Sequence, residues 1–474
     1  MLYAMKRFVI CIWTMLMTVG VYAQDLPQQL LEKYNNRDFA GIYALGSEQM
    51  KQMESEKDFT SYLESLREET GSINFAKPLQ NCNSWHTFEW RGEKKNLRVT
   101  WVMKDKQSFD DYFIDDVVMQ PNSRRHFPHD NPLQSHQDSI VHNYATAYLL
   151  QANTAGMSIG ILRSGKKYVY NYGAIRKNGP LPSADNIYVM GSIAKVFVGM
   201  MLSQAVVDKK AKFDDDVRKY LPGNYPNLQY NGTPIQLVQL ANHTSGLPHD
   251  LRELPSSITD LPFLDLMKAM ETYYPKDSLL HDLHQATLVS QPGTTYSYNG
   301  LAYHVLVAAL ETMYKQPYEQ ILTNFLKKNL NMFDTKIDLS DADMKRIVTG
   351  YRPSGDTIPM IQSSGFFYGG PRLNSTINDM LKFAVAQLSG KHKAMELSHH
   401  QTFEDKYRKV GISWMLGTNC LGQSEIFHTG STSGSFNSIL KLYPNQQSAC
   451  IIFTNDGSAQ NRLSAVERGI MLDL

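Results

Sequence analysis

Residues 188–195 read YVMGSIAK, and an almost unbroken apolar run, residues 196–202, follows them. A serine hydroxyl is a weak nucleophile at neutral pH and needs an adjacent base. If Ser192 opens a helix, Lys195 lies three residues later on the same face, within reach of that hydroxyl. Residues 193–207 are apolar on almost every face, which indicates a helix buried on all sides, where burial lowers a lysine pKa. These residues predict a nucleophilic serine with a lysine base beside it.

The Ser-x-x-Lys spacing occurs three times in the chain, so the spacing alone does not identify a site. Ser164 and Lys167 lie across a predicted hairpin turn. Ser438 and Lys441 lie in a predicted strand, where an odd separation puts two side chains on opposite faces. Only the pair that begins with Ser192 lies at the start of a buried helix.

Composition excludes several classes of protein. The chain has 474 residues, of which 42% are hydrophobic and 20% are charged, as is typical of a soluble globular protein. Its formal net charge is +1, with no basic stripe, so nothing indicates a nucleic-acid partner. This length is too great for one ordinary core and predicts two domains after a processed leader.

Residues 1–23 have the pattern of a secretory signal peptide. Lys6 and Arg7 supply the positive charge, residues 8–21 the apolar region, and residues 21–23 (VYA) the cleavage site. The apolar run is shorter than the ~20 residues that a membrane-spanning helix needs. We therefore expect a secreted or periplasmic protein with no transmembrane anchor after cleavage.

Two folded units are expected after the leader. They are a small α+β accessory domain at residues 24–121 and a larger domain at 133–474, joined by a polar linker with prolines at 122–132. In the first unit, apolar residues at helical spacing over residues 59–66 precede strand-like runs at 84–91 and 96–104.

The larger unit has strand patterns at both of its ends and helical patterns between them. The predicted strands are residues 157–162, 167–172, 412–418, 425–429, 436–443 and 448–454. Helical patterns at residues 135–150 and 461–474 flank them. This arrangement predicts an α/β (α+β) fold, in which both ends of the domain build one antiparallel sheet that carries a helical lobe.

Further motifs follow one another in this unit. In chain order they are NGTPI at 231–235, LANHTSGLP at 240–248, PGTTYSY at 292–298, GG at 369–370, LNSTINDM at 373–380 and HTG at 428–430. Together with Ser192 and Lys195, this set resembles the serine β-lactamase/DD-peptidase superfamily, and within it the class C β-lactamase-like serine hydrolases. The order of elements in residues 24–121 resembles a cystatin/NTF2-like accessory domain.

The resemblance implies catalytic roles for the matching residues. Ser192 would attack the substrate carbonyl and become acylated. Lys195 and Tyr298 would share proton transfer, the tyrosine as a phenolate or through a hydrogen-bond network. The backbone N–H groups of Ser192 and Ser431 would form an oxyanion hole.

The resemblance also implies substrate contacts, and two of them depart from the family pattern. His428, Thr429 and Gly430 would line the strand along which substrate lies, with Thr429 contacting a carboxylate. The family has Tyr-x-Asn where this chain has Asn299 and then Gly300, so the amide contact is missing unless Asn299 replaces it. His428 stands where efficient β-lactamases usually have lysine. Because histidine titrates near pH ~6.5, we expect it to change activity between about pH 5.5 and 7.5.

These departures favour a peptidase, amidase or esterase over an efficient β-lactamase. We expect an exported serine hydrolase that acts on β-lactams, D-amino-acid peptides or esters, with small molecules or short peptides, including cell-wall peptides, as substrates. The alternative is a catalytically weak penicillin- or peptidoglycan-binding protein of the same fold.

No cofactor and no metal is expected. Three histidine pairs, His126/His129, His281/His284 and His399/His400, form neither the His-x-His-x-Asp nor the His-Glu-x-x-His pattern.

Three cysteines remain after removal of the leader: Cys82, Cys420 and Cys450. Cys420 and Cys450 can pair in an oxidising compartment or remain buried thiols, and the sequence leaves both options open.

Overall fold

The computed structural model describes residues 25–116, 118, 126–151, 155–249, 251, 256–259, 276–352, 354–358, 372–432, 435–457 and 460–474. The predicted signal peptide lies outside these residues, as does the first part of the predicted linker. None of the helices described is both long enough and apolar enough to cross a membrane.

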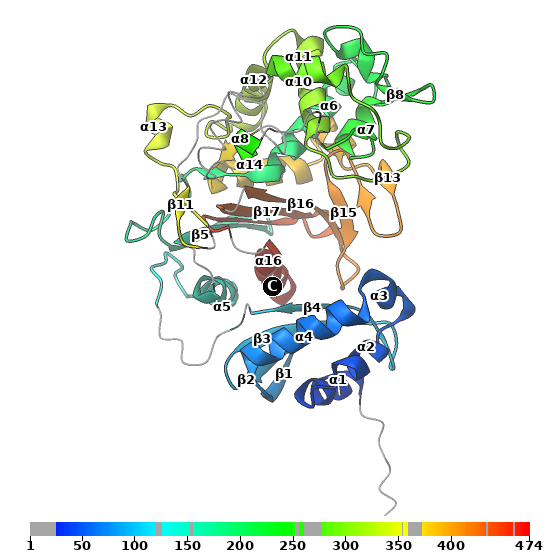
Figure 1. Ribbon diagram of the computed structural model, residues 1–474. Coiled ribbons are helices and arrows are strands. Elements are labelled where there is room, and N and C mark those ends of the chain that lie inside the picture. Colours follow the sequence, from blue (N-terminus) through cyan, green and yellow to red (C-terminus); the bar gives the residue numbers. More distant parts are fainter. Residues whose placement is uncertain are drawn as a thin grey trace, which may run out of the picture.

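The N-terminal part contains helices followed by a small sheet (Figure 1). Its elements are α1 (Leu26–Asn35), α2 (Phe39–Ala44), α3 (Glu48–Met53), α4 (Glu56–Thr70), β1 (Ile73–Cys82), β2 (Trp85–Gly92), β3 (Asn96–Met103) and β4 (Phe109–Asp115). The strands form an antiparallel meander in the order β1-β2-β3-β4. An Asp or Ser side chain accepts a backbone N–H at the start of each helix, as an N-cap should.

The helical spacing at residues 59–66 is confirmed as part of α4. Phe59 and Leu63 are buried in an aromatic-rich core with Trp90 and Trp101. Tyr62, in contrast, is 40% exposed. Strands β2 and β3 coincide with the two predicted runs, whereas β1 and β4 were not predicted.

The larger part is built on an eight-stranded antiparallel sheet in the order β13-β14-β15-β16-β17-β18-β5-β6. Its strands are β5 (Gly156–Arg163), β6 (Lys166–Gly173), β13 (Phe403–Glu404), β14 (Lys409–Val410), β15 (Met415–Thr418), β16 (Ser424–Thr432), β17 (Phe436–Tyr443) and β18 (Ser448–Thr454). Because β18 pairs with β5, both ends of the unit meet in one sheet, which confirms the predicted fold class.

The two faces of this sheet are covered differently (Figure 1). On one face, α5 (His136–Gln151) and α16 (Gln460–Asp473) share a buried cluster with the sheet that includes Val141, Ile159 and Ile452. On the other face lies a helical lobe, whose cluster includes Phe197, Leu440 and Ile451.

The lobe contains α6 (Ala194–Val207), α7 (Leu237–Ala241), α8 (Ser256–Thr259), α10 (Lys276–Leu283), α11 (Leu301–Tyr314), α12 (Tyr318–Leu330), α13 (Asp341–Met344), α14 (Ile377–Leu388) and α15 (Lys393–Ser398). Three short antiparallel pairs complete the part: β7 (Tyr188–Val189) with β12 (Asn374–Ser375), β8 (Gln229–Tyr230) with β9 (Thr233–Pro234), and β10 (Gly350–Tyr351) with β11 (Thr357–Ile358).

The N-terminal sheet lies against α16, on the side of the large sheet away from the lobe (Figure 1). Arg462 of α16 forms an ion pair with Asp116 at 2.7 Å. A disulfide joins Cys82, at the end of β1, to Cys420, in the turn between β15 and β16. Of the two options left open, pairing of Cys420 with Cys450 is excluded, because Cys420 pairs with Cys82. Cys450 is a free thiol whose side chain is buried in the cluster under α5 and α16.

Candidate active site

Ser192 lies in a 3₁₀ turn, Gly191–Ile193, that leads directly into α6. The Nζ of Lys195 donates a hydrogen bond to the Oγ of Ser192 at 3.2 Å. Lys195 is 1% exposed, because the first turns of α6 are buried on every face. This burial lowers the pKa of Lys195 to about 7. A substantial fraction of its amine is therefore neutral near pH 7 and able to accept a proton.

Two glycines let strand β16 approach the Ser192 segment closely. Gly191 has a φ of +55°, and a Cβ at this position would lie 2.7 Å from the backbone nitrogen of Ser431. A Cβ at Gly430 would overlap the carbonyl oxygen of Met190. The backbone around Ser192 therefore lies against that of Ser431, as an oxyanion hole made of two N–H groups requires.

Tyr298 lies in the loop before α11, beside the same lysine. The Nζ of Lys195 is 5.0 Å from the centroid of the Tyr298 ring. Desolvation raises the pKa of Tyr298 to about 12, although a hydrogen bond with Ser192 lowers it. The phenol is therefore protonated at neutral pH, so it can donate or relay a proton but does not serve as a standing phenolate.

His243 packs against the ring of Tyr298 and holds the backbone of the next residue. Its Nδ1 accepts the backbone N–H of Asn299 at 2.9 Å, and its ring centroid lies 4.3 Å from that of Tyr298. Burial, with the neighbouring Lys195 and His428, lowers the pKa of His243 well below its usual value. The imidazole is therefore neutral, with its second nitrogen carrying the hydrogen. The motif at residues 240–248 predicted no role for His243.

His428 lies in the middle of β16 and is 6% exposed. Its Nδ1 donates to the carbonyl oxygen of Thr429 at 2.6 Å. Burial and the nearby Lys195 lower the pKa of His428 to about 4. The expected titration between pH 5.5 and 7.5 is therefore wrong, because an imidazolium would be desolvated beside another cation.

Comparison with known proteins adds an independent observation to this geometry. The family model named Beta-lactamase matches residues 138–469 of the chain. The chain belongs to the Beta-lactamase family. The match covers Ser192, Lys195, Tyr298 and the β16 segment, so the protein is a serine hydrolase of the β-lactamase/DD-peptidase superfamily.

Individual relatives of this Beta-lactamase family member share about a quarter of its residues or fewer over the matched region. "D-alanyl-D-alanine-carboxypeptidase/endopeptidase AmpH" of Escherichia coli K12 is 26% identical over 297 residues, which are 61% of this chain and 72% of the relative. "Protein flp" of Staphylococcus aureus MRSA252 is 24% identical over 344 residues, 69% of this chain and 63% of the relative. The solved D-alanine carboxypeptidase AmpC from Burkholderia cenocepacia shares the fold, with a TM-score of 0.60 and 20% identity over 71% of this chain and 99% of that one.

Asn299 was expected to contact substrate, but in this Beta-lactamase family member its side chain is buried. Its side chain is 1% exposed and its Nδ2 donates to the carbonyl oxygens of Leu247 and Pro248 at 2.9 and 3.0 Å. Its Oδ1 accepts the N–H of Ala302 at 3.0 Å. The substrate-binding expectation is corrected, because the amide is occupied in holding the loop of Tyr298 and starting α11.

Tyr303 is a second residue of the site that was not predicted from the sequence. The Nζ of Lys195 lies 5.5 Å from the centroid of its ring. Its hydroxyl donates to the carbonyl oxygen of Ala241 at 2.7 Å and also contacts Ser413 at 2.7 Å. In the sequence, an aromatic residue within an apolar helix cannot be distinguished from an ordinary core residue.

The other Ser-x-x-Lys pairs do not form a second site. Ser164 lies in the β5–β6 turn. Ser438 donates from Oγ to the carbonyl oxygen of Met190 at 2.8 Å, while Lys441 forms an ion pair with Glu467 at 2.9 Å.

Within the described part of the chain, no three or more His, Cys, Asp or Glu side chains come together as a metal site. Residues 369–370 of the GG motif lie outside that part.

Proposed function

We propose that this protein is an exported serine hydrolase that forms an acyl-enzyme at Ser192 and hydrolyses D-amino-acid peptides, amides or esters. The observation that carries the proposal is the 3.2 Å hydrogen bond between Lys195 Nζ and Ser192 Oγ at a lysine whose pKa is lowered to about 7. A buried neutral amine is the base that a serine nucleophile needs.

The proposed reaction begins with neutral Lys195, which takes the proton from the Ser192 hydroxyl as its Oγ bonds to the substrate carbonyl carbon. The carbonyl oxygen becomes an oxyanion, which the N–H groups of Ser192 and Ser431 stabilise. One such donor is typically worth about 3–4 kcal/mol in the transition state. Tyr298 donates its proton to the leaving amine or alcohol and regains one from Lys195. Water then attacks the acyl-enzyme along the reverse proton path.

Support for export comes from the Cys82–Cys420 disulfide. Disulfides persist in the periplasm and outside the cell and are rare in the reducing cytosol. The pattern of residues 1–23 agrees with this location. We propose that residues 24–121 travel with the catalytic unit as a disulfide-linked accessory domain.

Support for the substrate class comes from His428. Its pKa of about 4 leaves it neutral, so β16 presents no lysine-like charge to a β-lactam carboxylate. Gly300 offers no side-chain amide where the family has asparagine. The peptidase named among the relatives acts on D-alanyl-D-alanine, which agrees with a preference for peptides over β-lactams.

The experiment compares turnover of a small activated ester, a D-alanyl-D-alanine peptide and nitrocefin by the full chain. Turnover of the ester or the peptide that Ser192→Ala abolishes supports the proposal. The competing function is a penicillin- or peptidoglycan-binding protein. It would be favoured by stoichiometric acylation of Ser192 without turnover of any of the three.

A further inference from the structure

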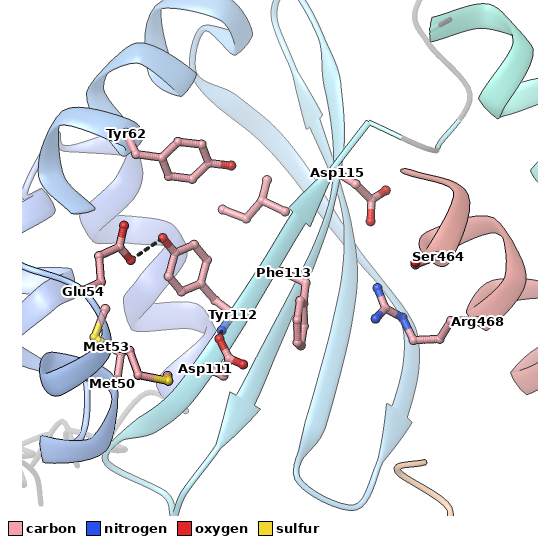
Figure 2. Close-up of a pocket in the computed structure, with 11 residues that line it drawn as sticks. Met50, Met53, Glu54, Tyr62, Asp111, Tyr112, Phe113, Asp115, Ser464 and Arg468 are labelled. Carbon is pink, nitrogen blue, oxygen red and sulfur yellow. Dashed lines mark hydrogen bonds between the residues drawn. The ribbon is translucent and has the colours of Figure 1, made fainter. Parts of the chain in front are cut away.

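A cavity of about 870 Å³ lies at the edge of the N-terminal sheet, beside α16 (Figure 2). We call it the β4 pocket and define it by Glu54, Tyr62, Asp111, Tyr112, Phe113 and Arg468. Strand β4 is the last strand of the sheet. Among the described residues, its outer edge pairs only through the bridge from Phe109 to Gly46. The pocket therefore extends along an open strand edge, between α3 and α4 on one side and α16 on the other.

One wall of the β4 pocket is acidic and aromatic. Glu54 accepts a hydrogen bond from the hydroxyl of Tyr112 at 2.8 Å, and Asp111 accepts the backbone N–H of Tyr112 at 2.8 Å. Neither carboxylate forms an ion pair with a lysine, arginine or histidine of the described chain. The rings of Tyr62 and Tyr112 lie beside them, with centroids 6.3 Å apart.

These acidic groups are held in a partly desolvated place. Burial raises the pKa of Asp111, and the charges of Asp110 and Glu54 raise it further. Two like charges without a cation are unfavourable, and a bound ammonium group would relieve that repulsion. Tyrosine ring faces also attract an ammonium group. This wall therefore fits an alkylammonium.

The opposite wall presents a cation. The guanidinium of Arg468, from α16, lies 5.4 Å from the ring centroid of Trp85 and 5.1 Å from that of Phe113. Figure 2 shows its side chain pointing from α16 toward β4. Among the described residues it makes no hydrogen bond or ion pair within contact distance. Asp115 also lines this wall, and its charge acts on Arg468. The planar fork of a guanidinium that lies beside two rings can bind a carboxylate with two hydrogen bonds.

We propose that the β4 pocket binds a short zwitterionic peptide, with its ammonium at Glu54 and Asp111 and its carboxylate at Arg468. The volume suits such a ligand, since small-molecule sites are commonly about 300–1,000 Å³. The rings of Tyr112 and Phe113, between Glu54 and Arg468, offer apolar surface to the rest of the peptide (Figure 2). Strand β4 and helix α16, which line the pocket, lie on the side of the large sheet away from the helical lobe (Figure 1). The proposed site is therefore separate from Ser192.

The test uses the full chain carrying Ser192→Ala, which prevents turnover, and isothermal titration calorimetry. The probe is the tripeptide N-acetyl-Ala-Lys-Ala with a free lysine ammonium and a free carboxylate. Two analogues each lack one charge: one has an acetylated lysine, and the other has a C-terminal amide. We expect each analogue to bind at least about tenfold more weakly, as loss of a charge-assisted hydrogen bond implies.

Variants test whether the acidic wall binds the ammonium group and Arg468 binds the carboxylate. Arg468→Gln should weaken the free tripeptide by about tenfold or more and leave the weak binding of the C-terminal amide unchanged. The double variant Glu54→Gln/Asp111→Asn should also weaken binding of the free tripeptide by about tenfold or more. It should leave the weak binding of the analogue with acetylated lysine unchanged. Glu64→Gln and Lys57→Gln change the same charges on exposed positions of α4 and should leave binding unaltered.

Folding is controlled separately. Arg468→Lys keeps a cation and a long side chain but loses the planar fork, so it should weaken the free tripeptide even if Arg468→Gln fails to fold. The Ser192-containing forms of all pocket variants should hydrolyse a small ester at the parent rate. Absence of saturable binding, or binding that the pocket variants leave unchanged, would overturn the proposal without touching the proposed function of Ser192.

Discussion

The Nζ of Lys195 lies 3.2 Å from the Oγ of Ser192, at the start of a helix whose first turns are buried on every side. Four features act on this pair. Burial lowers the lysine pKa, Tyr298 lies against it as a protonated phenol, and two neutral imidazoles, His243 and His428, are close by. Of these four residues, Lys195 is the one whose pKa lies near neutral pH.

Activity should follow the titration of Lys195. The pKa of this lysine is lowered to about 7, and the neutral amine is the active form, so kcat/KM should rise with pH. Between pH 6 and pH 8 the neutral fraction, and with it kcat/KM for a neutral ester, should rise about tenfold. A pH–rate profile measures this. A limb near pH 4 would assign the titration to His428 in place of Lys195.

Removing the Tyr298 hydroxyl should slow the chemical step. Tyr298→Phe retains the ring but deletes the proton that we propose is donated to the leaving group, so kcat should fall by about 10²-fold or more. Tyr303→Phe is the matched control. It removes a hydroxyl bonded to Ala241, should cost about 1 kcal/mol of unfolding free energy and should leave kcat close to that of the parent. Equal activity of Tyr298→Phe and the parent would exclude the phenol from the proton path.

The disulfide should hold the N-terminal part against the turn between β15 and β16. Replacing both Cys82 and Cys420 by Ala should lower the free energy of unfolding by about 2–4 kcal/mol. Cys450→Ala leaves that bond intact and is the comparison for a lost buried sulfur. In the denatured chain without residues 1–23, a thiol assay should find one free thiol before reduction and three after it. Three thiols before reduction would contradict the pairing.

Penicillins and cephalosporins should be poor substrates. The lysine charge and the asparagine amide are both absent, and each contact is worth about 1–3 kcal/mol. The specificity constant for nitrocefin should therefore lie about two to four decades below that of an efficient β-lactamase. Steady-state kinetics with nitrocefin and an activated ester measure the difference. Nitrocefin turnover at the rate of an efficient enzyme would show that another residue supplies these contacts.

The sequence predicted those parts of the site that lie in one local element. Ser192 and Lys195 are joined by a single helical turn, and periodicity alone shows that this helix is buried. The run in β3 was likewise predicted from its alternation, because side chains alternate between two faces of a strand. Strands β2 and β15 to β18 were predicted from strand-like stretches of sequence. The fold class followed from strands at both ends of one unit.

Features that depend on tertiary contacts could not be predicted. The neutrality of His428 results from burial beside Lys195, and the use of Asn299 as a loop clamp results from the carbonyls of Leu247 and Pro248. Cys82 and Cys420 are separated by 338 residues and meet only when the accessory sheet packs against the larger part. The linker predicted at residues 122–132 gave no indication of this bond or of the Arg462–Asp116 ion pair, both of which join the two parts.

The central claim is that Ser192 is the nucleophile. The direct test is mass spectrometry of the full chain after reaction with a fluorophosphonate, followed by peptide mapping. We expect one adduct per chain, located on Ser192, and none in Ser192→Ala, while Ser164→Ala and Ser438→Ala should react like the parent. An adduct of undiminished yield in Ser192→Ala, or one mapped to another serine, would contradict the account.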